Sequence, residues 1–418
     1  MFETLAKAII LSRGITFTDE ACALAAETGA KGQNMVYNMP KGHSPGTFRP
    51  QELLIQGEDG YETCVSAIAP HSPASVVATV RHGRLELSAP GCEGIFSRLG
   101  PVSFVPSPSY YRRTTRAGTP LTRIVSACGV DELNVWPWHD CAISQTCTFC
   151  GVNKVDASQG HRAAPFTSRR RSGSALADWA AIRDHFLAEL VEAVEIALQD
   201  ECYAHHAHLI LISGNLRNDE LDAQADIYAD MAACLTRHFP ARFSEGIVAV
   251  TAPPSTVAGL ERMRQAGVEI SVLNLEAWSP EAFAQDCPGK HQIGRDRYLS
   301  MLRAGVDVFG WGKSWCNFVL GLDPVQVTLD GCLELAAMGI APSANVLHLD
   351  EGARCRKTTP GPREIVHFFA ALNDIYRRHD LAPYYCQRAL RTSLSNEAYH
   401  GRLAPLGTTA PLDLVPDH

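Results

Sequence analysis

Three cysteines lie close together in a stretch whose spacing suits inorganic chemistry. Cys141, Cys147 and Cys150 follow a Cx5CxxC pattern, just after an apolar run that ends at Trp138. Thiolate is the soft ligand that iron–sulfur clusters require, and three thiolates can hold three irons of a [4Fe-4S] cluster. No further cysteine follows before Cys202. The spacing therefore predicts a cluster with one iron open to a small ligand.

Two other interpretations of these cysteines are open from the spacing alone. A structural zinc site prefers four ligands in paired knuckles, and His139 could supply the fourth ligand here. Alternatively, the cysteines are simple buried thiols, since a cysteine without a ligand packs as a small apolar residue. The choice among these interpretations depends on how well the rest of the chain agrees with each.

The composition indicates an ordinary folded protein. The 418 residues are 46% hydrophobic and 20% charged, and the length fits two or three domains or one barrel with additions. A net charge of −8 argues against a nucleic-acid-binding surface. The first residues do not resemble a signal peptide, and no apolar run is long enough to span a bilayer. We therefore expect a cytoplasmic protein with reduced cysteines, and neither nucleic acid nor membrane as a partner.

Residues 1–125 are predicted to form an additional α+β N-terminal region. Helices are expected over 2–12 and 19–30, and two short strands within 76–87 should form a hairpin around His82 and Gly83. No motif in this region indicates its role. At the other end, residues 386–418 are expected to form a C-terminal extension.

From about residue 131 strands and helices alternate, which predicts a parallel sheet. The expected strands cover 132–136, 208–212, 246–251, 268–274, a stretch beginning with 306–309, and 344–349; the expected helices cover 175–198, 222–239, 256–266, 295–304, 325–338 and 362–378. These units predict an α/β fold, a partial (βα)6 TIM-type barrel over residues 126–385. In such barrels the functional residues lie at the C-terminal ends of the strands.

Polar residues follow two of these predicted strands. Ser213, Gly214 and Asn215 end the second strand, where a glycine lets the backbone approach a ligand closely. Asn274 and Glu276 end the fourth strand, and residues two apart on a strand share one face. Both side chains should therefore point into the barrel mouth. A plain turn and an exposed strand end are the alternative interpretations.

The cysteine stretch resembles the signature loop of the radical SAM superfamily, in its biotin-synthase-like branch. The Cx5CxxC variant is similar to the loop of the radical SAM maturase of the iron-guanylylpyridinol cofactor pathway, whereas the commonest family spacing has a first gap two residues shorter. Phe149 stands where the family usually carries an aromatic residue. The resemblance implies that Cys141, Cys147 and Cys150 hold a [4Fe-4S] cluster whose open iron binds S-adenosyl-L-methionine (SAM).

The resemblance also implies roles for the strand-end residues. Those after the second strand resemble the family's glycine-rich motif, which receives the methionine amino group of SAM. Asn274 and Glu276 are similar to a triplet of biotin synthase that hydrogen-bonds the ribose and the amino-acid head group. Arg295, with Arg297 as its competitor, is expected to pair with the SAM carboxylate.

The implied activity is the reductive cleavage of SAM to a 5′-deoxyadenosyl radical, which abstracts hydrogen from a small polar substrate. An electron donor such as flavodoxin or ferredoxin would supply the electron. The resemblance indicates a biosynthetic or cofactor-maturation reaction. Rearrangement, formation or cleavage of a C–C bond, and methyl transfer all stay open.

Further candidates lie in the C-terminal third. Cys355 and Cys386 are weak candidates for hydrogen donation or a covalent adduct. Two other functions remain as alternatives. A non-catalytic iron–sulfur scaffold or maturation protein would keep the three cysteines without a SAM pocket, and a zinc-dependent barrel hydrolase would use His348, Asp350 and Glu351.

Overall fold

The computed structural model describes residues 1–32, 48–138, 140–143, 145–152, 174–200, 208–244, 246–349, 353–383 and 390–403. A curled seven-stranded sheet forms its centre, with the strand order β13-β12-β11-β10-β9-β8-β7. The parallel strands are β8 (Glu132–Val135), β9 (His208–Ile212), β10 (Ile247–Val250), β11 (Val268–Val272), β12 (Ser314–Leu320) and β13 (Ile340–Val346). β7 (Val125–Cys128) is antiparallel to β8. The predicted partial barrel is confirmed.

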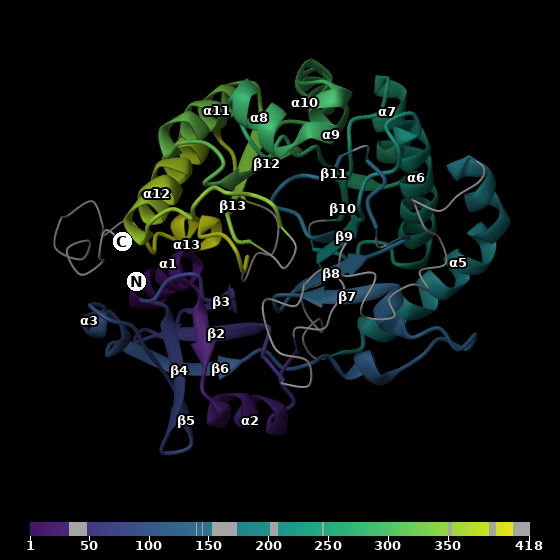
Figure 1. The fold of residues 1–418 in the computed structure, drawn as a ribbon. Coiled ribbons are helices and arrows are strands. Elements are labelled where there is room, and N and C mark those ends of the chain that lie inside the picture. Colours follow the sequence, from purple (N-terminus) through teal and green to yellow (C-terminus); the bar gives the residue numbers. More distant parts are fainter. Residues whose placement is uncertain are drawn as a thin grey trace.

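Helices cover the outer face of this half-barrel (Figure 1). They are α5 (Ala175–Ala197), α6 (Leu221–His238), α7 (Val257–Gln265), α10 (Arg295–Phe309), α11 (Val325–Ala337) and α12 (Pro362–His379), with the short α8 (Pro280–Asp286) and α9 (Pro288–Ile293) before α10. Local signals fix their starts: the Ser174 side chain accepts a hydrogen bond from the Ala177 amide, and Pro362 opens α12. The strands are buried on both faces, as covered parallel sheets require.

Two of the predicted strand boundaries are wrong. Val306–Phe309 is the last turn of α10, because Leu302, Gly305 and Phe309 recur at helical spacing on its buried face, and Gly310 then ends the helix at φ 103°. The fifth strand is β12, which starts at Ser314. The sixth strand, β13, starts at Ile340 rather than 344. It contains Pro342, which a strand at the edge of a sheet tolerates.

The N-terminal region contains α1 (Phe2–Arg13), α2 (Asp19–Glu27), the short α3 (Glu93–Phe96) and two three-stranded sheets. One sheet joins β1 (Ile15–Phe17), β4 (Val76–Arg81) and β5 (Arg84–Ser88); the other joins β3 (Glu62–Ser66), β2 (Glu52–Gly57) and β6 (Leu99–Phe104). The predicted hairpin is confirmed, with its two turn residues at φ 51° and 74°. The division of the chain at residue 125 stays a prediction.

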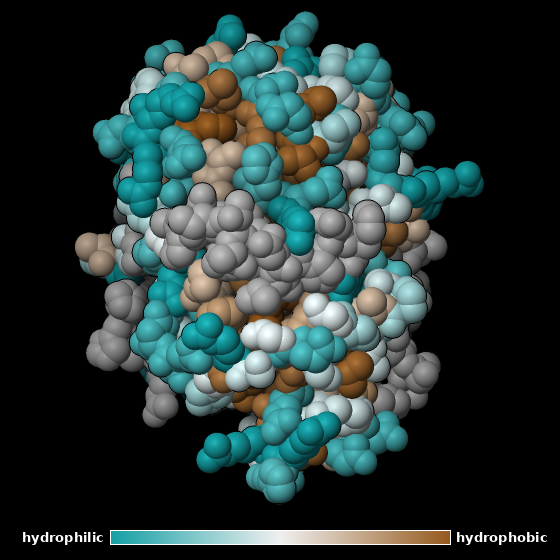
Figure 2. All heavy atoms as spheres, turned by 90° about the vertical axis from the view of Figure 1, so that its left-hand side faces the viewer, coloured by the Kyte–Doolittle hydropathy of each residue, from teal (hydrophilic) through white to brown (hydrophobic). Residues whose placement is uncertain are grey.

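The first and last described segments pack together. α1 lies beside α12 and α13 (Ser395–Tyr399) (Figure 1), and one buried apolar cluster includes Ile9 of α1 and Phe369 of α12. On the face seen in Figure 2, hydrophilic side chains surround smaller groups of hydrophobic ones, as on an ordinary protein surface. No described helix has the length and apolar content needed to cross a membrane.

Two fully buried ion pairs stabilise the N-terminal region, and the first of them, through Lys7, ties that region to the end of the described chain. Lys7 Nζ lies 2.7 Å from Glu397 Oε1, and Lys31 Nζ lies 2.6 Å from Glu52 Oε2. Lys7 also donates to the Leu390 carbonyl at 2.6 Å. Burying a charge is costly unless it is paired and hydrogen-bonded. These contacts therefore require the two segments to stay in register with each other.

The buried His208 at the start of β9 predicts a loss of stability in acid. Burial, with the charge of Lys313, lowers the pKa of His208 to about 3. An unfolded chain binds this proton below about pH 6.5, whereas the folded chain does not until pH nears the lowered value. Above about pH 6.5 the buried, neutral His208 does not weaken folding. As pH falls below that value, proton binding by the unfolded chain lowers the free energy of unfolding, by about 2 kcal/mol at pH 5.

Urea unfolding at pH 7 and pH 5 checks this prediction. The fall in the free energy of unfolding between the two pH values should be smaller in H208Q than in the wild type, by about the amount that His208 contributes. An identical fall in both proteins would show that other groups cause the acid sensitivity.

Candidate active site

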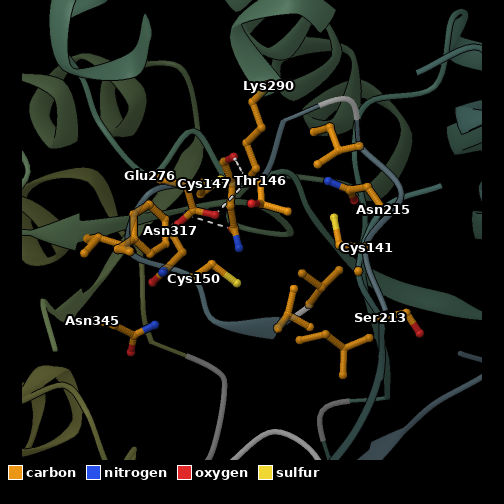
Figure 3. A pocket seen from close by; sticks show the side chains of 18 of the residues that line it. Cys141, Thr146, Cys147, Cys150, Ser213, Asn215, Glu276, Lys290, Asn317 and Asn345 are labelled. Atoms are coloured by element: carbon orange, nitrogen blue, oxygen red, sulfur yellow. Dashed lines mark hydrogen bonds and ion pairs between the residues drawn. The ribbon is translucent and has the colours of Figure 1, made fainter. Parts of the chain in front are cut away.

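A cavity of about 350 Å³ opens at the C-terminal ends of the parallel strands (Figure 3). Residues from the cysteine loop, 141–150, form one part of its wall, and residues that end the strands form the rest. The predicted candidates on its wall are Cys141, Cys147, Phe149, Cys150, Ser213, Gly214, Asn215, Asn274 and Glu276. The structure thus brings together at one cavity all the predicted cluster ligands and every predicted SAM-binding residue except Arg295.

Hydrogen bonds hold the start of the cysteine loop to the end of β9. The Trp138 indole donates to the Gly214 carbonyl at 2.6 Å, and Ser213 Oγ donates to the Trp138 carbonyl at 2.9 Å. The Ala142 amide donates to the Asn215 carbonyl at 2.8 Å. The three residues after β9 therefore position the loop, through the Ser213 hydroxyl and the carbonyls of Gly214 and Asn215, as well as lining the cavity.

The other side of the loop is held by the α8–α9 segment. The Thr148 amide donates to the Asp286 carbonyl at 2.8 Å, and its hydroxyl donates to Asp286 Oδ1 at 2.7 Å. The Gly289 amide donates to the Gln145 carbonyl at 3.0 Å. The loop is thus fixed from two sides, which presents its thiols in a defined arrangement.

Two glycines make this close packing possible. A Cβ at position 214 would lie 2.3 Å from the Asp140 carbonyl oxygen and 2.6 Å from Cys141 Cα. A Cβ at position 289 would lie 2.3 Å from the Gln145 carbonyl oxygen. The sequence predicted that the backbone at Gly214 closely approaches a ligand. The structure shows that the approaching group is the cysteine loop itself.

The thiols differ in how readily they ionise. A hydrogen bond from the Cys287 thiol, helped by the charge of Lys290, lowers the pKa of Cys147 below its usual value. Burial raises the pKa of Cys141 to about 11. An iron ion next to either sulfur would favour the thiolate, because a coordinating thiol is deprotonated. A soft set of three thiols, in which the pKa of Cys147 is lowered, fits an iron–sulfur cluster.

A site for a single metal ion would need a different arrangement of ligands from that of an iron–sulfur cluster. Among the described residues, no group of three or more His, Cys, Asp or Glu side chains converges as one metal ion would require. In a cluster each thiolate instead binds its own iron. The proposed zinc ligand His139 and the hydrolase candidates Asp350 and Glu351 lie outside the described residues. His348 lines the cavity, with Nδ1 3.1 Å from the Val346 carbonyl oxygen.

Glu276 and Lys290 form an ion pair on the cavity wall (Figure 3). Lys290 Nζ lies 2.6 Å from Glu276 Oε1 and donates to the Asn274 carbonyl at 2.7 Å. Burial is the strongest single influence and would lower the pKa of Lys290, but the Glu276 carboxylate, together with Tyr298 and the thiols of Cys147 and Cys287, raises that pKa well above its usual value. The backbone of Glu276 has φ 71°, in the left-handed region that non-glycine residues rarely adopt. Such strain is typical of functional positions.

The structure places Arg295 away from the cavity. Its guanidinium stacks 4.5 Å from the centre of the Trp278 ring and donates to the Trp278 carbonyl at 3.1 Å. The competing Arg297 donates instead to the Pro254 carbonyl at 3.1 Å. The cation on the cavity wall near Asn274 and Glu276 is Lys290, which the sequence analysis missed because α9 was not predicted.

Asn317 and Asn345 were missed as well, although a signal existed. Both line the cavity, and each interrupts an otherwise apolar, buried strand. An asparagine inside such a strand is unusual unless its side chain is hydrogen-bonded or faces a polar site. The backbone amide of Asn317 donates to the side-chain oxygen Oδ1 of Asn274 at 3.1 Å, which links the end of β11 to β12.

The two weak cysteine candidates have different outcomes. Cys355 is buried and is not among the cavity-lining residues; its thiol lies 3.9 Å from Asp286 Oδ1 and its amide donates to the Thr148 carbonyl at 3.0 Å. It therefore supports the cysteine loop from behind. Cys386 lies outside the described residues.

Comparison with known proteins gives relatives at low identity. No family model matches the chain. The chain is 26% identical over 279 residues to the bacteriochlorophyllide c C-7(1)-hydroxylase of Chlorobaculum limnaeum; the match covers 63% of this chain and 64% of that protein. The chain therefore spans less than two thirds of the length of this curated relative.

Solved structures that match part of this chain are more distant in sequence. A radical SAM methyltransferase from Sphaerobacter thermophilus is 12% identical with a TM-score of 0.41, covering 89% of this chain and 80% of that one. Methylornithine synthase is 11% identical with a TM-score of 0.38, covering 60% and 63%. Coproporphyrinogen III oxidase from Escherichia coli, described as a radical SAM enzyme, is 12% identical with a TM-score of 0.35, covering 65% and 58%. Two of these three structures are described as radical SAM enzymes, and the curated relative is described as a hydroxylase.

Proposed function

We propose that this chain is a radical SAM enzyme that acts on a small polar substrate. The observation that carries the proposal is the shared cavity: the thiols of Cys141, Cys147 and Cys150 and the polar strand-end residues line one space at the C-terminal edge of a half-barrel. Ligand sites of such sheets lie at this edge. A [4Fe-4S] cluster, when bound to the three thiols, would supply the electron for reductive cleavage of SAM, received from a donor such as flavodoxin or ferredoxin.

The residues around the cysteines are suited to hold SAM. The side chains of Asn215 and Asn274 offer both donors and acceptors to the methionine head group and the ribose hydroxyls. The carboxylate of Glu276 accepts hydrogen bonds, and Lys290 supplies the positive charge that the SAM carboxylate needs. In this proposal Lys290 takes the role that the sequence assigned to Arg295.

Apolar residues supply a second kind of surface in the same cavity. Ile212, Val250, Val319 and Val346 line it between the polar strand ends. Such side chains can bind a flat base and exclude water from a reactive centre. Abstraction of a hydrogen from a C–H bond is compatible with hydroxylation, which is the activity in the name of the curated relative. It is equally compatible with rearrangement, formation or cleavage of a C–C bond, and methyl transfer.

Replacing Cys147 with alanine tests the proposal. The full chain is reconstituted with iron and sulfide without oxygen, SAM and dithionite are added, and 5′-deoxyadenosine is measured. The wild type should form it and C147A should not, because removal of one thiolate leaves two ligands for the cluster. C332A is the matched control, since Cys332 is buried in α11 away from the cavity; it should behave as the wild type does.

Each contrary outcome has a definite meaning. A loaded cluster without 5′-deoxyadenosine would favour the non-catalytic scaffold. Equal cluster loading in C147A and the wild type would remove Cys147 as a ligand, and with it the basis of the proposal.

A further inference from the structure

One cation on the cavity wall takes no part in the proposed SAM site. Arg391 and Thr392 line the cavity together with Asn345 and His348. The Val346 amide donates to the Thr392 carbonyl at 2.9 Å, and Thr392 Oγ1 donates to Asn345 Oδ1 at 2.7 Å. These residues therefore form the part of the wall next to β13, the edge strand.

This part of the wall is distant in the sheet from the start of the cysteine loop. Cys141 is held beside β9, whose end bonds to the Ala142 amide, and β10, β11 and β12 lie between β9 and β13. If one end of a bound molecule lay near the cysteines, its other end, toward β13, would thus meet Arg391. The cavity provides two polar regions, one for SAM and one for another group.

The guanidinium of Arg391 is fixed in place before any ligand arrives. Nη1 donates to Glu52 Oε1 at 2.8 Å, and Glu52 is itself fully buried and paired with Lys31. The Arg391 backbone is held as well, since the Ser66 amide donates to the Arg391 carbonyl at 3.0 Å and Lys7 holds the carbonyl of Leu390. Fixing a binding group in advance removes the entropy cost of ordering it on binding.

Arg391 keeps donors for a ligand. Its side chain is 12% exposed and lines the cavity, and the Glu52 contact is made through Nη1. A guanidinium has five donors in a planar fork that matches a carboxylate. Because Asn345 Oδ1 accepts from Thr392 Oγ1, the side-chain amide nitrogen of Asn345 supplies a second donor on the same cavity wall.

The local charges select the kind of anion. Lys31 and Arg391 contribute two positive charges, and Glu52 and Glu132 act on Arg391 with two negative charges. These four charges sum to zero. Because a neutral cluster offsets little negative charge, it suits a monoanion better than a phosphate with about two charges. We propose that Arg391 and the amide of Asn345 bind a carboxylate of the substrate, so that the substrate is a carboxylic acid. This inference names the substrate class of the proposed radical SAM site and rests on that proposal.

Matched probes test it: 3-phenylpropanoate, its methyl ester and 2-phenylethyl phosphate. Binding to the reconstituted full chain with SAM present is measured by isothermal titration calorimetry without oxygen. We expect the wild type to bind the carboxylate more tightly than the ester and the phosphate. R391Q should weaken carboxylate binding about 10- to 100-fold, as loss of a charge-assisted hydrogen bond predicts. R391K keeps the charge without the planar fork, so its affinity for the carboxylate should lie between those of the wild type and R391Q.

R98Q is the matched control, because Arg98 pairs with Glu58 on the exposed surface; it should bind all three probes as the wild type does. Equal binding of carboxylate and ester, preference for the phosphate, or unchanged carboxylate binding in R391Q would overturn the inference. If circular dichroism shows that R391Q does not fold, the wild type and R391K decide by the same criteria.

The radical SAM proposal can fail separately. The contacts of Arg391 with Glu52 and of Glu52 with Lys31 do not involve the cysteines. The same titration without added iron or SAM therefore still reports on Arg391. Carboxylate binding without 5′-deoxyadenosine formation would keep the inference and reject the proposed function.

Discussion

Replacing Gly214 with alanine is expected to displace the cysteine loop and remove most of the bound iron. The new Cβ would lie 2.3 Å from the Asp140 carbonyl oxygen and 2.6 Å from the Cβ of Cys141, and these atoms cannot move aside without moving the loop. Changes next to metal ligands typically cost about 10- to 100-fold in metal affinity. Overpacking should also lower the free energy of unfolding by about 1–3 kcal/mol. Iron and sulfide analysis after reconstitution, beside urea unfolding, measures both effects.

G100A is the control for this substitution. A Cβ at Gly100 in β6 would lie 3.0 Å from a backbone oxygen, so it is crowded but distant from the cysteines. G100A should bind iron as the wild type does. Full iron loading in G214A would mean that the loop can shift without losing its ligand geometry, and that Gly214 serves another purpose.

Replacing Lys290 with methionine is expected to destabilise the protein strongly. It would leave the Glu276 carboxylate, 12% exposed, without its partner 2.6 Å away. Breaking a buried ion pair by removing one partner costs about 3–5 kcal/mol. We expect about 3 kcal/mol, the lower end of that range, because both side chains face a cavity that water can enter. Urea unfolding of the chain without added iron measures the loss.

A double variant separates charge from shape. K290M/E276Q removes both charges, so most of the stability lost in K290M should return, whereas SAM binding should not. R98Q breaks an exposed ion pair and should change the free energy of unfolding by less than about 1 kcal/mol. A loss in K290M no larger than that in R98Q would contradict the view that this pair is a buried, structural part of the site.

The strand ends could be predicted from the sequence because alternation of strands and helices fixes which residues leave the sheet at its C-terminal edge. Ser213, Gly214, Asn274 and Glu276 follow directly after well-marked apolar strands, and all four line the cavity. The cysteine loop could be predicted for the same reason, since it follows β8. Whether these residues hold the cluster and SAM stays a prediction.

Lys290 and Arg391 could not be predicted, because nothing local marks them. Lys290 reaches the cavity only because α8 and α9 fold back onto the cysteine loop, through contacts such as that of Gly289 with Gln145. Arg391 reaches it because Glu52, far away in the chain, holds its guanidinium. Arg295 illustrates the converse: it opens the helix before the fifth strand as expected, but its guanidinium stacks on the Trp278 ring away from the cavity.

The contacts of Lys7 with Glu397 and of Glu52 with Arg391 join residues 390 and 339 positions apart. During synthesis the cysteine loop and every strand of the half-barrel leave the ribosome before Arg391 does. The wall next to β13 is therefore the last to form, and pairing across such separations is slow. Under the proposed function, iron and sulfide would therefore enter most easily before Arg391 and Thr392 complete this wall.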